Sequence, residues 1–92
     1  MNKEYMQALV KHRLEVLQNR YKKACACKDE HGNLITAGAA AAIRTQSKRD
    51  MQLLKLLLWL LSFTSSFMIE DEEAIDGFHR LVQPVERFRR NK

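Results

Sequence analysis

The chain has 92 residues, which is the length of a single domain. Its composition, with 46% hydrophobic and 29% charged residues, is too apolar for an intrinsically disordered protein. Three glycines and one proline leave few interruptions, so long helices are favoured over many short strands. The formal net charge of +5 suits a polyanionic partner such as RNA, DNA or an anionic membrane surface.

The cysteines and the first residues bear on the cellular compartment. Cys25 and Cys27 are the two cysteines, and they lie too close in sequence for an easy mutual bridge, which argues against a secreted disulfide scaffold. The segment 1–5 has neither an apolar core nor a small-residue cleavage site. We therefore expect no signal peptide and a cytoplasmic location.

The first predicted helix runs over residues 3–24. Its apolar residues recur at steps of three and four, as Met6, Val10, Leu14, Leu17, Tyr21 and Ala24. This spacing predicts one stripe that faces a core, with Lys11 and Lys22 along one edge and Arg13 and Arg20 along the other.

A turn is predicted at residues 28–33, where Asp, Gly and Asn occur together. Residues 24–38 fold either as a short β-hairpin around this turn or as a plain interhelical loop. Cys25, Cys27 and His31 lie in the same segment, but a structural zinc site needs four ligands, usually with paired Cys-x-x-Cys spacing. We therefore expect neither a metal nor a cofactor.

The second predicted helix covers residues 37–67, with Thr36 as its N-cap. At about 100° per residue, Arg44, Lys48 and Lys55 fall within one narrow arc together with Trp59. The opposite side is rich in leucine and is predicted to face the core, as Leu53, Leu56, Leu57, Leu60, Leu61 and Phe63. Residues 51–69 are just long enough to span a bilayer, but Lys55 and several polar residues make a membrane segment an unfavourable interpretation.

A third helix is predicted over residues 70–83, opened by the acidic run Glu70–Glu73 and ended by Pro84. A basic tail follows at residues 85–92. The sequence therefore predicts a mostly α protein, a single three-helix domain over residues 1–92.

No glycine-rich phosphate loop, nucleophile elbow or other enzyme motif is present in the sequence, so we expect a binding protein and not an enzyme. Up to residue 55 there are eleven lysines and arginines against five acidic residues, and such clustering gives affinity for phosphates. The residues predicted to contact a nucleic acid or a partner are Arg13, Arg20, Lys22, Lys23, Arg44, Lys48, Lys55, Arg87, Arg89 and Arg90.

The small size, the single basic helical domain and the lack of enzyme motifs resemble the phage-encoded anti-CRISPR proteins that inhibit type I-F surveillance complexes. The resemblance covers general character and assigns no residues. It implies an inhibitor that docks on the protein subunits and RNA of an RNA-guided ribonucleoprotein and blocks target DNA binding by steric and electrostatic contact. Its location would be the host cytoplasm.

Two other functions stay open at the level of sequence. One is a small basic DNA-binding regulator, dimeric through its leucine-rich helix, and the other is a membrane-associated accessory protein. Because that helix packs either within the chain or across a dimer, the oligomeric state is also left open.

Overall fold

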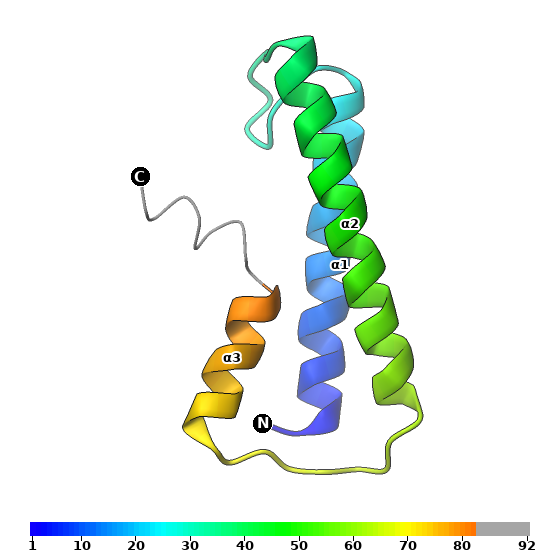
Figure 1. The fold of residues 1–92 in the computed structure, drawn as a ribbon, viewed down its shortest axis with the longest axis vertical. Helices are drawn as coiled ribbons and strands as arrows, with labels where there is room; N and C mark the ends of the chain where they lie inside the picture. The colour runs from blue at the N-terminus through cyan, green and yellow to red at the C-terminus, as the bar shows by residue number, and fades with distance from the viewer. Residues whose placement is uncertain (83–92) are drawn as a thin grey trace.

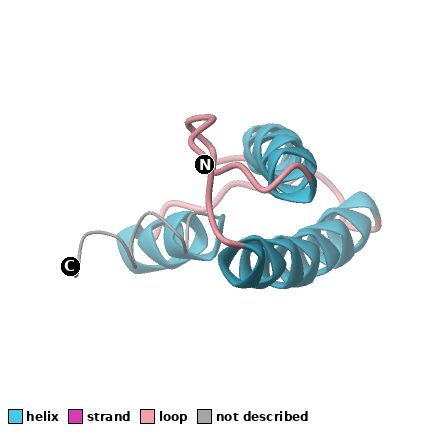
Figure 2. Ribbon diagram, turned by 90° about the horizontal axis from the view of Figure 1, so that it is seen from above, coloured by secondary structure: helices cyan, strands magenta, loops and turns pink. Residues whose placement is uncertain are grey.

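The computed structural model of the protein describes residues 1–82. It shows three α-helices, α1 (Lys3–Cys25), α2 (Ala37–Ser62) and α3 (Glu72–Val82). α1 and α2 run antiparallel as a long hairpin, and α3 lies beside the lower half of that hairpin (Figure 1). Seen from above, the three helices stand at the corners of a triangle and not in one layer (Figure 2). The predicted small, mostly α fold is confirmed; the predicted tail, with Arg87, Arg89 and Arg90, lies outside the described residues.

α1 begins and ends with recognisable capping groups. The Asn2 side chain accepts a hydrogen bond from the Tyr5 amide at 2.8 Å, which caps the N-terminus. At the other end Cys27 adopts a positive φ of 55°. The amide of Cys27 bonds to the Ala24 carbonyl at 3.0 Å and that of Lys28 to the Lys23 carbonyl at 2.9 Å. This pattern is a Schellman motif with cysteine where glycine is usual.

The segment after α1 is a tight turn with a single β-bridge. Gly32 has a φ of 83°, and the Asp29 carboxylate accepts hydrogen bonds from the amides of His31 and Asn33, each at 2.9 Å. Lys28 and Leu34 form one isolated antiparallel bridge. Of the two alternatives for residues 24–38, the structure has a loop closed by this bridge, because α1 continues to Cys25 and takes up the residues that a first strand needs.

The predicted start of α2 is confirmed and its predicted end is wrong. Thr36 caps the helix, since its hydroxyl accepts from the Ala39 amide at 3.1 Å. The helix ends at Ser62 and not at residue 67. The Ser62 hydroxyl donates to the Trp59 carbonyl at 2.5 Å and the Thr64 hydroxyl to the Leu61 carbonyl at 2.8 Å. Such side-chain bonds compete with the helical pattern and favour a helix end.

The core lies where α1 meets α2 and α3. Its buried members come mainly from the predicted stripe of α1 and from a different side of α2 than predicted, and they are Met6, Val10, Leu14, Leu17, Leu54, Leu61, Phe78 and Val82. Leu57 is only partly buried, and Leu53, Leu56, Leu60 and Phe63 are exposed. The prediction is confirmed for Leu61 and wrong for the exposed residues, because the buried stripe of α2 also uses the small residues Ala40 and Ser47, which an apolar count overlooks.

α3 is held near the start of α1 by backbone contacts. Asn2 and Met68 form an isolated antiparallel bridge, and the Ile69 amide donates to the Met1 carbonyl at 2.7 Å. α3 begins at Glu72, two residues after the predicted start, and the Asp71 carboxylate accepts from the Glu73 amide at 3.1 Å. Across residues 1–82, no helix is both long enough and apolar enough to cross a membrane.

Candidate nucleic-acid interface

Charge is separated along the long axis of the helical hairpin. The antiparallel pairing of α1 and α2 gathers seven cations in the half of the hairpin that carries the connecting turn, here called the basic end, namely Arg20, Lys22, Lys23, Lys28, Arg44, Lys48 and Arg49. Asp29 and Glu30 are the acidic residues in the turn itself. The opposite end, here called the acidic end, carries two cations, Lys3 and Arg80, against six acidic residues, Glu4, Glu70, Asp71, Glu72, Glu73 and Asp76. Figure 1 shows these two ends at the top and bottom of the molecule.

Two cations of the basic end also stabilise the fold. Arg44 is half-buried, and its guanidinium donates to the Ala24 carbonyl at 3.3 Å, which satisfies an acceptor in the last turn of α1. Lys23 is exposed, and its ammonium donates to the Glu30 carbonyl at 2.8 Å, which ties the turn to α1. Arg44 is therefore less available to a phosphate than the sequence predicts. The Lys23 ammonium uses one N–H for the Glu30 carbonyl and can still donate its other N–H groups to a phosphate.

Arg13 does not lie at the solvated edge of α1, so the prediction that placed it there is wrong. Its side chain is buried, with 8% of its surface exposed, in the groove between α2 and α3 that Asp50 and Leu17 also line. Its position at the edge of the apolar stripe becomes an interior position because α3 covers that edge. Sequence periodicity alone does not show where α3 docks.

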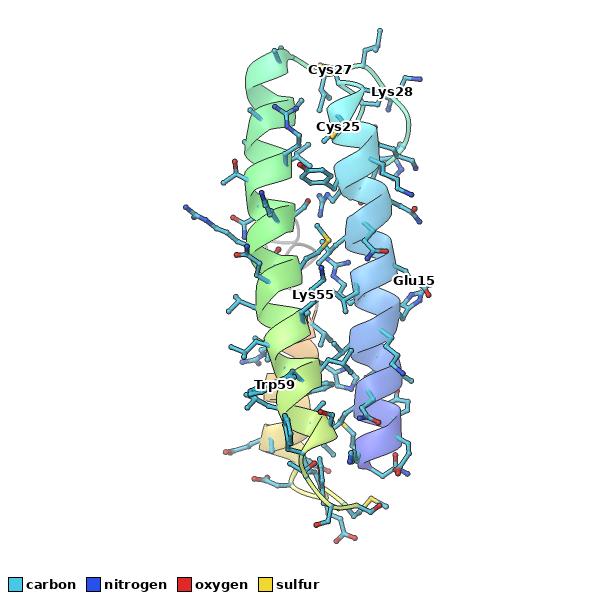
Figure 3. All side chains as sticks on the ribbon, turned by 90° about the vertical axis from the view of Figure 1, so that its right-hand side faces the viewer. Glu15, Cys25, Cys27, Lys28, Lys55 and Trp59 are labelled. Atoms are coloured by element: carbon cyan, nitrogen blue, oxygen red, sulfur yellow. The ribbon has the colours of Figure 1, made fainter. Side chains whose placement is uncertain are left out.

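The predicted cationic stripe of α2 reaches the surface. Lys48 and Lys55 are exposed on the same side of the helix as half-buried Arg44. Figure 3 looks onto the side of the hairpin away from α3 and shows Lys55 and Trp59 along α2, with Lys28 at the basic end above them. The exposed lysines available to a phosphate backbone thus include those at positions 22, 23, 28, 48 and 55.

A shallow hollow of about 300 Å³ lies on α1 near the turn. Arg20 and Lys23 line it, and both side chains have donors suited to a phosphate oxygen. Glu30 and His31 also line it, with the Glu30 carboxylate 3.7 Å from the imidazole. Because the Glu30 carboxylate repels an anion, the exposed lysines outside the hollow are the stronger candidates for phosphate contact.

The turn carries a carboxyl group with a shifted pKa. The pKa of Asp29 is lowered, first by the hydrogen bond from the Asn33 backbone amide, against partial desolvation, and also by the bond from the His31 amide. The deprotonated carboxylate therefore helps to hold the turn that joins the two helices of the basic end.

Cys25 and Cys27 lie where α1 ends and the turn begins. Cys25 is exposed, Cys27 is half-buried, and both are free thiols. Among residues 1–82, no three or more His, Cys, Asp or Glu side chains are grouped so that they could hold a metal ion. The exposed acidic run at the start of α3 has the geometry of a helix cap.

Lys28 and Arg49 are exposed members of the basic end that sequence reasoning missed. The signal that finds them is the antiparallel pairing of the two long helices, which brings the turn and the first half of α2 beside the end of α1. Comparison of the chain with protein-family models, with curated proteins and with solved structures found no match.

Proposed function

We propose that the protein is a non-enzymatic binding protein whose basic end contacts the phosphate backbone of a nucleic acid held in a larger protein–nucleic-acid complex. The observation that carries the proposal is the collection of cations from two helices and a turn at one end of the hairpin. Lysines that neutralise phosphates release condensed counterions, and clustered lysines do this better than scattered ones.

The acidic end supports a partner that holds the protein in one orientation. The carboxylates there repel phosphates, so a nucleic acid that meets the basic end is kept away from the start of α3. A blocking protein benefits from such polarity because it docks one way round and covers one surface.

The resemblance to anti-CRISPR proteins names a specific complex to test, a type I-F surveillance ribonucleoprotein. In that form of the proposal, the exposed lysines contact guide-RNA phosphates or occupy the path of target DNA. The chain then inhibits target binding by occupying space and by electrostatic competition.

The experiment compares two single charge reversals with the same change in net charge. Lys48→Glu lies in the basic end, and Arg80→Glu lies on α3, where Arg80 is exposed and pairs with Asp76 at 2.9 Å. Each variant is titrated against the purified surveillance complex and against naked RNA and duplex DNA of the same sequences. We expect Lys48→Glu to weaken binding to the ribonucleoprotein by about tenfold, the equivalent of about 1.4 kcal/mol, and Arg80→Glu to leave it nearly unchanged.

The outcomes separate the functions. Equal losses for both variants would show that net charge alone matters and would contradict a basic-end interface. Tight, salt-sensitive binding to naked duplex DNA without preference for the ribonucleoprotein would instead support the DNA-binding regulator. Binding to neither class of target would overturn the proposal.

A further inference from the structure

An apolar face on the outside of α2 has no partner among residues 1–82. Its side chains are each between 50% and 70% exposed, and they are Leu53, Leu56, Trp59, Leu60 and Phe63 of α2 with Leu81 of α3. They are here called the apolar face. Leu53 and Leu81 line one groove of about 370 Å³ between α2 and α3, so the face continues from one helix to the other.

The apolar face points away from the core. On α2 the residues that face α1 are Ser47, Leu54 and Leu61, seven residues apart, and the side opposite them carries Leu56 and Phe63. Trp59 and Phe63 stack edge to face, with ring centroids 4.7 Å apart. Figure 3 shows Trp59 on the outer, solvent-facing side of α2. Contiguous exposed apolar surface of this kind is typical of an interaction site.

We propose that this face is the interface of a homodimer in which the α2 helices of two copies pack antiparallel. The inference is independent of the proposed function, because none of the six side chains is a cation of the basic end. Each exposes roughly 100 Å², so complete burial of all six in both copies would remove about 1,200 Å² from solvent, which is the lower limit of a specific interface.

The distribution of charge favours a second copy in the antiparallel orientation. Arg49 lies in the same row of α2 as Leu53, Leu56 and Leu60, at helical spacing, and so extends the apolar face towards the basic end. With the helices antiparallel, Arg49 of each copy points towards the acidic end of the other. A parallel pair would set basic end against basic end, which is repulsive.

The shapes of the side chains agree with the same orientation. The two aromatic rings, Trp59 and Phe63, lie at one end of the face, and the smaller Leu53 lies at the other. Antiparallel packing centred between Leu56 and Leu60 sets Phe63 of each copy opposite Leu53 of the other. The interface is isologous, as a twofold dimer requires.

The test is the mass of the full chain in solution over a micromolar concentration range, by sedimentation or light scattering. We expect a species of twice the 10.8 kDa chain mass at the upper end of the range. The protein has a single tryptophan, Trp59, so dimerisation also shifts its fluorescence to shorter wavelength.

The variant Leu56→Glu with Leu60→Glu should weaken dimerisation by about 100-fold or more, because each carboxylate would be buried without a partner. The matched control is Leu34→Glu, which changes a leucine that is 80% exposed in the turn and leaves the mass unchanged. Circular dichroism checks that every variant keeps its helices. A wild-type chain that stays monomeric throughout the range would overturn the proposal, and so would a double variant that dimerises like wild type.

A charge reversal tests the orientation. Arg49→Glu should weaken the dimer several-fold, because it replaces attraction to the acidic end of the other copy with repulsion. A dimer of undiminished affinity contradicts that arrangement. Monomers that bind vesicles of anionic phospholipid with a Trp59 fluorescence shift would assign the face to a membrane surface and refute the dimer.

Discussion

The close packing of α1 against α2 at the basic end depends on small residues, and replacing one of them is a sensitive test of the hairpin. Ala24 on α1 and Ala40 on α2 are both fully buried, at 0% exposure. Leucine at position 40 adds three carbon atoms where no surface is accessible. Overpacking of this kind costs about 1–3 kcal/mol. In a domain of this size each kcal/mol lowers the melting temperature by about 4–8 °C, so we expect Ala40→Leu to lower it by roughly 5–20 °C.

The matched control is Ala42→Leu, two residues further along the same helix and exposed. Leucine has nearly the helix propensity of alanine, so this change should alter the free energy of unfolding by less than about 0.5 kcal/mol. The assay is thermal unfolding followed by circular dichroism at 222 nm. A variant Ala40→Leu that melts like wild type, or two variants that melt equally early, would refute the antiparallel contact that assembles the basic end.

Three further predictions concern the turn and its flanking helix ends. Thr36→Ala removes the N-cap of α2 and should lower the free energy of unfolding by about 1 kcal/mol in urea denaturation; an unchanged midpoint would show that the cap contributes nothing. Cys27→Gly should raise the free energy of unfolding by about 0.5 kcal/mol, because glycine adopts the positive φ without steric cost. A loss of stability in this variant would contradict the positive φ at position 27. The pKa of Asp29 is lowered, so its carboxylate stabilises the turn fully above a pH of about 3.9. This stabilisation is lost as the pH falls through the lower pKa of the folded state. The protection of the Asn33 amide against hydrogen exchange should therefore depend on pH in the wild type and not in Asp29→Asn. The same pH dependence in that variant would assign the effect to another group.

The stripe of α1 was predictable because its apolar residues have only one helical side in common. Five of the six stripe residues are buried, and Tyr21 is half-buried. The N-cap Thr36 was predictable for a local reason, since its hydroxyl bonds within its own helix turn. The buried side of α1 and the start of α2 therefore depend little on tertiary contacts.

The orientation of α2 was not predictable in the same way. Leucines occupy most of its circumference between residues 53 and 61, and only docking decides which of them are buried. The buried side is chosen by the small residues Ala40 and Ser47, which let α1 approach. Arg13 was misplaced for a related reason, because α3 covers the edge of α1 on which it lies. The basic end needed tertiary information too, since Lys28 and Arg49 join it through the pairing of two helices.

The salt dependence of nucleic-acid binding tests the central claim most directly. Five exposed cations of the basic end, at positions 22, 23, 28, 48 and 49, predict that the logarithm of the affinity for single-stranded RNA falls with the logarithm of salt with a slope of about −3.5, at about 0.7 per phosphate contact. Lys48→Ala should reduce the magnitude of that slope by about 0.7, while Arg80→Ala leaves it unchanged. A wild-type slope near zero, or equal effects of the two variants, would contradict a phosphate-binding basic end.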